Sequence, residues 1–589
     1  MVQELLLYRS VRALLILACI AWTLLAGCSR SGEPRPFAFA AGNVNSEQSP
    51  SLQLVPNSTE SSAILHVLVD EGYLTDLRGS DFPGYRAELQ RFYETADYSP
   101  AWVRNRKPTP QALALIQVLQ SAADQGLLPE DYDSPLWSSR LAMLDRLQPL
   151  GEQSDQARFD VALTVSAMRY ISDLHGGRVI PGRPQYVGAS DQADFDLAEF
   201  LRQQIVEAVD VETSLKQLEP SFPAYQRTMQ ALDAYSKLAR EDQEEEELLP
   251  IPSKAVRPGD RYEGIPRIVR LLRRLGDLST EATATDREAL YDGELVDAVK
   301  RFQGRHGLDP DGVIGQQTLK ALNTPLAHRV LQLQLALERW RWLPHEFTRP
   351  PIIVNIPEFS LHAYNQELQR AFSMKLVVGR ASRHQTPLFV SEIKHVIFRP
   401  PWNVPMSIQV KELVPQIVKD PEYVRKGNFE IIDRQGNVVS EGEVNDGIVK
   451  ALRSGRLALR QRPGVNNSLG LVKFVFPNEY DVYMHGTPAM SLFSRSRRDF
   501  SHGCIRVEAP AELAAWVLQE QPEWTPDRIQ TAMNGEETLW VSLNRPVPVL
   551  ILYTTAAVQE DGEVRFFEDI YNQDAVLEKA ISELRSAPE

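Results

Sequence analysis

The sequence Ser501-His502-Gly503-Cys504-Ile505-Arg506-Val507 holds the one cysteine beyond the N-terminal segment, since Cys19 and Cys28 both belong to that segment. A single thiol set between a histidine, a glycine and an arginine is an unusual choice for packing alone. The thiolate is a nucleophile, and an unperturbed thiol is only a few per cent ionised near neutral pH. A catalytic Cys504 therefore needs a base, and His485 is the candidate. The alternative is an inert cysteine, because cysteine is often buried in cores.

The composition limits the class of protein. At 589 residues the chain exceeds what one hydrophobic core normally serves, so we expect roughly three or more domains. The formal net charge of −15 lacks the basic footprint of a nucleic-acid-binding protein. The sequence has no second cysteine near Cys504 and no His-Glu-x-x-His stretch. We therefore expect no nucleic-acid partner, no metal and no cofactor.

The N-terminus predicts the cellular compartment. Arg9 and Arg12 precede an apolar run at 13–25 that is too short and too early for an ordinary membrane-spanning helix. The run ends in Leu25-Ala26-Gly27-Cys28, which is similar to the lipobox of bacterial lipoproteins. That resemblance implies lipidation of Cys28, and the Ser29 that follows favours the outer membrane. The alternative is an uncleaved signal anchor in the inner membrane. Either way we expect a periplasmic, membrane-anchored protein.

The first half of the chain divides by periodicity and composition. We interpret residues 1–28 as the signal peptide and anchor, and the Pro-, Ser-, Gly- and Asn-rich residues 29–59 as a flexible tether. Residues 60–250 carry apolar residues at helical spacing and predict a helical scaffold domain. The stretch His175-Gly176-Gly177-Arg178 within it is best explained as a helix end. The acidic run at 241–247 marks the boundary of this domain.

Residues 255–325 predict a compact domain of three helices, at 268–275, 294–305 and 317–322. A calcium loop could explain Asp309 and Asp311, but no closing glutamate follows them. The stretches Ala298-Val299-Lys300-Arg301-Phe302-Gln303 and Asp311-Gly312-Val313-Ile314-Gly315 resemble the three-helix peptidoglycan-binding domain. This resemblance implies attachment to peptidoglycan.

The periodicity becomes strand-like after residue 345. We expect a mainly β domain at 345–560, with closing strands at 539–541 and 547–553, and a C-terminal extension at 561–589. A mostly polar insertion at 407–465 is large enough to be a lid that excludes water from an acyl intermediate. Alternatively, it is a surface excursion without a role. The expected fold class is therefore multidomain α+β, with a helical scaffold, a three-helix domain and a β domain that bears the lid.

Strand alternation places the candidate base. Tyr483 and His485 share one face of their expected strand, so His485 can point at a site while the other face packs in the core. Gly503 allows close approach of the chain, so the backbone N–H groups of Gly503 and Cys504 could form an oxyanion hole. His485 would take the thiol proton and return it to the leaving amine. Arg506 could hold a substrate carboxylate, or could form an ordinary salt bridge.

The histidine precedes the cysteine here, whereas in papain-like and NlpC-type peptidases the nucleophile comes first. His485-Gly486-Thr487 and Ser501-His502-Gly503-Cys504-Ile505-Arg506 resemble the signature of the L,D-transpeptidase, or YkuD-type, catalytic domain. The chain looks similar to the large multidomain (YcbB-like) members. Further stretches that match are Val377-Val378-Gly379-Arg380, Thr386-Pro387, Pro401-Trp402-Asn403-Val404-Pro405 and Leu469-Gly470-x-Val472-Lys473-Phe474.

This resemblance implies acyl transfer between peptidoglycan stem peptides. Cys504 would attack the diaminopimelate carbonyl before a terminal D-alanine, release that D-alanine, and pass the thioester to the side-chain amine of an acceptor stem. The product is a 3→3 cross-link, and carbapenems would acylate the same thiol. Gly486 would orient His485 through its backbone carbonyl. The residues expected to line the substrate groove are Ser501, His502, Arg506, Tyr483, Trp402 and Asn403.

The sequence leaves other functions open. An L,D-carboxypeptidase, or an enzyme that attaches or detaches wall-bound lipoprotein, would use the same acyl-enzyme with another acceptor. A non-catalytic lipoprotein tether would use the peptidoglycan-binding domain together with the lipid, and it would need neither Cys504 nor His485. Association with other wall synthases is possible for any of the enzymes.

Overall fold

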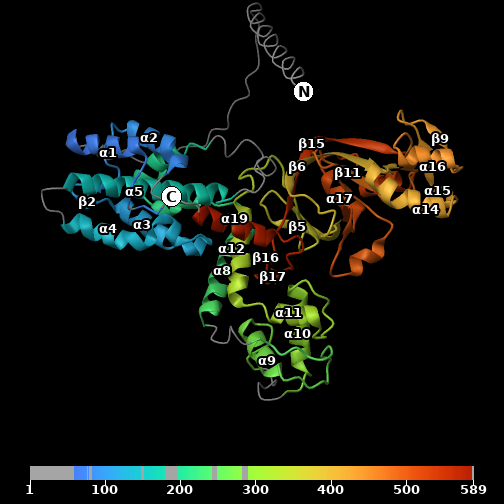
Figure 1. Ribbon diagram of the computed structural model, residues 1–589, viewed down its shortest axis with the longest axis horizontal. Helices are drawn as coiled ribbons and strands as arrows, with labels where there is room; N and C mark the ends of the chain where they lie inside the picture. The colour runs from blue at the N-terminus through green and yellow to red at the C-terminus, as the bar shows by residue number, and fades with distance from the viewer. Residues whose placement is uncertain are drawn as a thin grey trace, which may run out of the picture. The chain divides into compact units, whose positions relative to one another are not determined.

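The computed structural model describes residues 59–75, 77–78, 82–146, 152–179, 195–241, 248–281 and 289–586, all within the unit from Asn57 to Glu589 (Figure 1). The predicted signal peptide, Cys28 and the predicted tether up to its last residue lie outside these ranges. Within the described ranges, none of the helices is both long and apolar enough to cross a membrane.

The first described domain is helical, as predicted. Its longest helix, α5 (Glu152–Gly176), is buried at every position from 159 to 168 and packs against α1 (Thr59–Glu71). The helix ends as predicted, with Gly177 in the left-handed conformation (φ 79°). The other helices are α2 (Arg86–Glu94), α3 (Pro110–Gln120), α4 (Ser134–Arg146), α6 (Leu197–Phe200), α7 (Val211–Lys216) and α8 (Pro223–Glu241).

A second small domain has its own core. Its helices are α9 (Ile265–Arg274), α10 (Glu294–Arg305) and α11 (Gln316–Leu322), close to the predicted positions. The side chain of Gln303 accepts the Gly312 N–H (2.8 Å) and donates to Asp311 (3.0 Å), so the motif glutamine holds the glycine turn. The helix α12 (Leu326–Trp340) follows this domain.

Nine strands of the third domain form one sheet, in the order β13-β5-β14-β12-β11-β6-β15-β3-β4, and an additional β4–β5 pairing closes it on itself. The helices α17 (Pro510–Val517) and α18 (Pro526–Asn534) pack into the same core as one face of the sheet. The two predicted closing strands are parts of one strand, β15. The strands are β3 (Ile352–Asn355), β4 (Ser360–Tyr364), β5 (Arg370–Gly379), β6 (Phe389–Phe398), β11 (Val472–Val475), β12 (Met484–His485), β13 (Asp499–Ser501), β14 (Ile505–Val507) and β15 (Leu539–Leu552).

The insertion is a subdomain with a core of its own, which includes Val414, Ile417 and Leu452. Its separate sheet has the order β7-β10-β8-β9 and already begins at Trp402, ahead of the predicted start at 407. The strands are β7 (Trp402–Asn403), β8 (Phe429–Ile432), β9 (Val438–Ser440) and β10 (Ala458–Gln461), and the helices are α13 (Met406–Ile408), α14 (Val414–Lys419), α15 (Tyr423–Lys426) and α16 (Asp446–Arg453).

The C-terminal segment packs against the rest of the chain. The hairpin of β16 (Ala556–Val558) and β17 (Val564–Phe566) and the helix α19 (Gln573–Ser586) follow β15, and both β16 and α19 contact α12.

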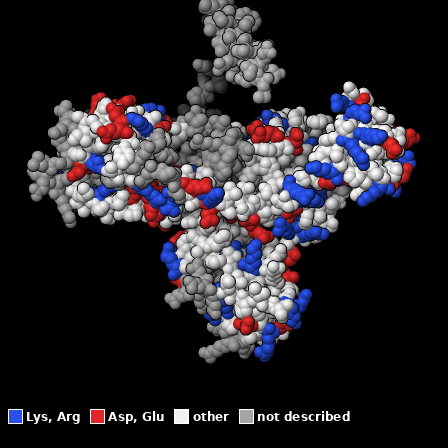
Figure 2. All heavy atoms as spheres, in the orientation of Figure 1, with Lys and Arg blue, Asp and Glu red and all other residues white. Residues whose placement is uncertain are grey.

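Despite the net charge of −15, acidic and basic side chains are interspersed over the visible face of the molecule (Figure 2).

Candidate active site

Three adjacent strands place Lys473, His485 and Arg506 side by side. Lys473 of β11 pairs with His485 of β12, and His485 pairs with Arg506 of β14. Residues directly opposite one another on neighbouring strands project from the same face of a sheet. Their chain neighbours, among them Phe474, Met484, Ile505 and Val507, lie in the core. The three polar side chains therefore lie on the face opposite the core, beside Cys504.

The Cys504 thiol is partly buried and has two hydrogen-bond partners. Its Sγ donates to the carbonyl oxygen of Asp481 (3.7 Å), and the Tyr483 hydroxyl bonds to the sulfur. The Trp402 side chain in turn bonds to the Tyr483 hydroxyl. Burial raises the pKa of the Cys504 thiol, and the bonds from Tyr483 and the charge of Lys473 only partly oppose it. The thiol is therefore protonated at neutral pH.

His485 is buried, and its Nδ1 lies 2.5 Å from the carbonyl oxygen of Gly486. This is the contact that the predicted role of Gly486 requires. Because a carbonyl only accepts, Nδ1 carries the proton of the neutral ring, and Nε2 is the basic nitrogen. Burial, followed by the charges of Arg506 and Lys473, lowers the pKa of His485 to about 3. The imidazole is therefore neutral across the physiological range.

The thiol and the imidazole are not yet hydrogen-bonded to each other. Among the described residues, the hydrogen bonds of Cys504 Sγ go to Asp481 and Tyr483 rather than to His485. Such contacts are often long without substrate and tighten when it binds, so His485 is still the candidate base. Burial raises the pKa of the Tyr483 hydroxyl far above its ordinary value. Tyr483 thus stays protonated and can donate to a thiolate, but it cannot act as the base.

Arg506 has a free hydrogen-bonding position inside the site. Its Nε is buried and has no hydrogen-bond partner among the described residues. Burial and the nearby Arg380 lower the pKa of the guanidinium. Within the described ranges, Arg506 forms no ion pair with a carboxylate. The salt-bridge alternative is therefore not what the structure shows. A half-buried guanidinium with a buried, unpartnered Nε, next to the candidate nucleophile, is suited to bind an anionic group of a substrate.

The loop before Cys504 differs from its predicted roles in two respects. Ser501 is buried, and its hydroxyl donates to the Cys504 carbonyl (2.6 Å) and accepts the Gly503 N–H (3.1 Å). Ser501 therefore holds the loop and does not line a groove. Because the Gly503 N–H is occupied, it does not serve as an oxyanion donor as predicted. The Cys504 N–H is the donor that has no partner among the described residues.

Three of the predicted groove residues belong to, or reach, the insertion. His502 Nε2 lies 2.5 Å from Glu412 Oε1 of the insertion, and its ring is next to that of His384. Trp402 and Asn403 form β7 of the insertion sheet. Trp402 reaches the site through Tyr483, whereas Asn403 is exposed. The insertion is thus connected to the loop before Cys504 through His502, and to Tyr483 through Trp402.

Lys473 is a site residue outside the predicted set. Its Nζ lies 3.6 Å from the centroid of the Tyr483 ring, and burial lowers its pKa. A cation over an aromatic face is stabilising, and here it also favours a thiolate at Cys504. Strand alternation around Val472 and Phe474 could have assigned it to the outer face. That Lys473 lies opposite His485, however, follows only from the register of the strands β11 and β12.

The pH dependence of thiol reactivity follows from these two pKa shifts. Because the pKa of Cys504 is raised and that of His485 is lowered to about 3, no thiolate–imidazolium pair forms at mildly acidic pH. We expect the alkylation rate with iodoacetamide to rise continuously with pH, through and beyond the ordinary thiol pKa of about 8.5. Glutathione, measured in parallel, is the control. A plateau of reactivity near pH 5 would contradict this assignment.

Comparison with known proteins defines the class of the domains. Residues 349–548 match the model of the L,D-transpeptidase catalytic domain, and residues 261–322 match a family described as "Putative peptidoglycan binding domain". Residues 87–232 match a scaffold domain. The chain thus contains an L,D-transpeptidase catalytic domain preceded by a peptidoglycan-binding domain, which confirms the predicted resemblance and fold class.

A protein of Haemophilus influenzae, described as "Putative L,D-transpeptidase", is 30% identical to this chain over 297 residues. The match covers 50% of this chain and 58% of that protein.

Proposed function

We propose that this protein is a cysteine-dependent L,D-transpeptidase that forms 3→3 diaminopimelate cross-links in peptidoglycan. The observation that carries the proposal is Arg506, whose buried, unpartnered Nε lies in the same site as the thiol of Cys504. A donor tetrapeptide stem ends in a carboxylate, and this guanidinium can bind it next to the nucleophile. The L,D-transpeptidase catalytic domain at 349–548 supports the same reaction class.

In the first half-reaction, Cys504 Sγ attacks the carbonyl carbon of the diaminopimelate that precedes D-alanine. His485 accepts the thiol proton and transfers it to the departing amine, so that a thioester and free D-alanine form. The neutral state of His485 keeps it ready to accept this proton. In the second half-reaction, the side-chain amine of an acceptor diaminopimelate attacks the thioester, and the thiol regains its proton.

We also propose that the enzyme works in the periplasm and is held to a membrane through lipid on Cys28 or through an uncleaved anchor. The support is the lipobox-like sequence at 25–28 together with a peptidoglycan-binding domain at 261–322. A tether at one end and wall affinity in the middle of the chain would keep the catalytic domain close to its polymeric substrate.

Mass spectrometry of the purified protein tests the proposed reaction. The full-length protein in detergent is incubated with a disaccharide-tetrapeptide and, separately, with a carbapenem. A covalent adduct together with a 3→3 dimeric muropeptide supports the transpeptidase. Tripeptide without dimer would instead indicate a carboxypeptidase, in which water is the acceptor. No adduct with either compound would leave a wall-binding tether.

Replacing Arg506 by glutamine is expected to raise KM for the tetrapeptide donor about tenfold to 150-fold, the worth of one charge-assisted hydrogen bond of ~1.5–3 kcal/mol. The measurement is the rate of D-alanine release against donor concentration. The matched control is a donor whose terminal carboxylate is amidated: the wild type should lose affinity for it, while Arg506→Gln should barely distinguish the two donors. A variant that still prefers the free carboxylate would argue against this role.

A further inference from the structure

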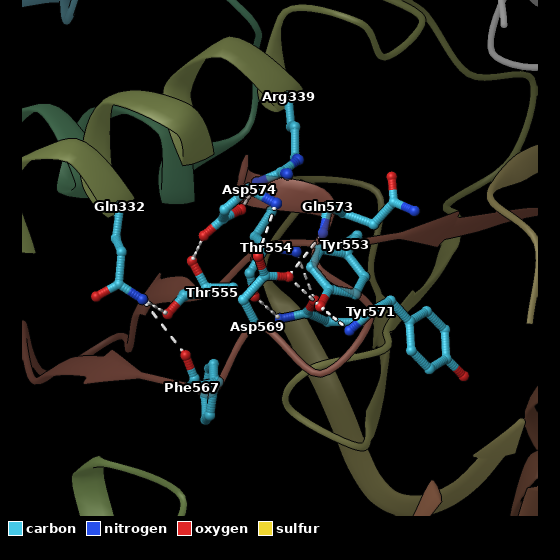
Figure 3. A network of polar contacts seen from close by, with 11 residues as sticks. Gln332, Arg339, Tyr553, Thr554, Thr555, Phe567, Asp569, Tyr571, Gln573 and Asp574 are labelled. Carbon is cyan, nitrogen blue, oxygen red and sulfur yellow. Dashed lines mark hydrogen bonds and ion pairs between the residues drawn. The ribbon is translucent and has the colours of Figure 1, made fainter. Parts of the chain in front are cut away.

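A chain of hydrogen bonds links helix α12 to the C-terminal segment (Figure 3). Arg339 of α12 forms an ion pair with Asp574 near the start of α19 (2.5 Å). Asp569 accepts the Asp574 N–H (3.0 Å) and the hydroxyl of Tyr553 (2.5 Å). The Tyr553 hydroxyl accepts the N–H of Tyr571 (2.8 Å). These bonds fix the backbone at Tyr571, whose ring points away from the network in Figure 3.

Tyr571 extends the chain into the catalytic sheet. Its hydroxyl donates to the carbonyl of Gly379 (2.5 Å) and accepts the N–H of Thr386 (3.2 Å). The Thr386 hydroxyl accepts the N–H of Gly379 (2.9 Å) and donates to the carbonyl of Gly503 (2.8 Å). Both side chains are buried. Glycine is needed at 379, because a Cβ there would lie 1.9 Å from the carbonyl oxygen of His384.

The last of these bonds determines where the Cys504 N–H points. In a planar trans peptide, the C=O and the following N–H point in opposite directions. Thr386 therefore fixes the Cys504 N–H when it holds the Gly503 carbonyl. Ser501 already occupies the Gly503 N–H and the Cys504 carbonyl. The peptide is thus held from both sides, with one N–H directed away from Thr386 and without a partner among the described residues.

We infer that Thr386, held by Tyr571, aims the Cys504 N–H at the carbonyl oxygen of the bound substrate, where it stabilises the oxyanion of the tetrahedral intermediate. Tyr571 and Thr386 are positioning residues, since they act through the Gly503–Cys504 peptide. The inference rests on the proposed acyl transfer. It also extends the catalytic unit to a segment beyond 349–548, the range that matches the catalytic-domain model.

Two reagents separate oxyanion formation from thiol reactivity. Acylation by a carbapenem passes through a tetrahedral oxyanion, whereas alkylation by iodoacetamide displaces iodide and forms none. Loss of a whole oxyanion donor costs about 10²–10³-fold, so a misaligned donor should cost about 10–100-fold. In the full-length protein we expect Tyr571→Phe and Thr386→Val to slow acylation by this factor. Their alkylation rates should stay within about twofold of the wild type, since a donor to the oxyanion adds nothing to displacement of iodide.

Two further variants complete the test. Thr386→Ser keeps the hydroxyl and should restore most of the acylation rate. Tyr364→Phe removes another buried tyrosine hydroxyl of the same domain, on β4, and should change neither rate. Equal acylation of Tyr571→Phe, Thr386→Val and the wild type would overturn the inference, as would parallel losses of acylation and alkylation, which indicate a displaced thiol. A wild type that is alkylated but never acylated would instead overturn the proposed function.

Discussion

Replacement of Cys504 by alanine should abolish D-alanine release and cross-link formation, with a loss of about 10⁴-fold or more. The size follows from the chemistry, because no other thiol lies among the described residues to form the acyl-enzyme. Removal of the catalytic nucleophile of a serine protease lowers kcat about 10⁶-fold. The measurement is muropeptide analysis after incubation with disaccharide-tetrapeptide, with adduct formation followed by mass spectrometry.

The same variant separates catalysis from wall binding. The peptidoglycan-binding domain has its own core, built around residues such as Ile268, Val299 and Phe302, and Cys504 is not part of it. Sedimentation with purified sacculi and the thermal unfolding midpoint should therefore be those of the wild type. A Cys504→Ala protein that still produces 3→3 dimers would refute the thioester mechanism, whatever its affinity for the wall.

Replacement of His485 by glutamine is expected to lower kcat for D-alanine release at pH 7 by about 10²–10⁴-fold, the usual worth of a positioned general base. The thiol has a raised pKa, so without a base few molecules carry the thiolate. At higher pH the thiol ionises by itself, and the defect should shrink. The measurement is the pH profile of kcat for the variant and for the wild type.

Tyr483→Phe is the matched control for the base, because the Tyr483 hydroxyl contacts the sulfur directly. With its pKa raised by burial, Tyr483 can only donate. Its loss should cost about tenfold or less, in line with one neutral hydrogen bond. If Tyr483→Phe proves more damaging than His485→Gln, the proton must leave by another route and the assignment of His485 is wrong.

Local patterns in the sequence predicted much of the fold. The helical spacing across 160–174 depends only on near neighbours in the chain, and it appears in the structure as part of α5. The alternation predicted that Tyr483 and His485 lie together, and their ring centroids are 5.6 Å apart, although β12 begins only at Met484. The predicted C-terminal extension was harder to interpret. Its packing depends on pairs such as Arg339 with Asp574, which no periodicity links.

The candidate site likewise combines contacts between near neighbours in the chain with contacts between distant residues. The contact of His485 with Gly486 lies between adjacent residues and could be expected from the motif. The bond between His502 and Glu412 instead joins the loop before Cys504 to the insertion, and the neighbourhood of Lys473 and His485 depends on strand register. Contacts of this kind are decided by the completed fold rather than by residue type and spacing.

The closed sheet also constrains the order in which the catalytic domain can fold. Its last strand, β15, pairs in parallel with its first strand, β3, through contacts such as Val549 with Ile352. Pairing between segments so distant in the chain carries a high entropic cost and forms slowly. The sheet therefore cannot close until the C-terminal strand has been synthesised. A nascent or truncated chain that ends before β15 would have the cysteine but not the completed sheet behind it.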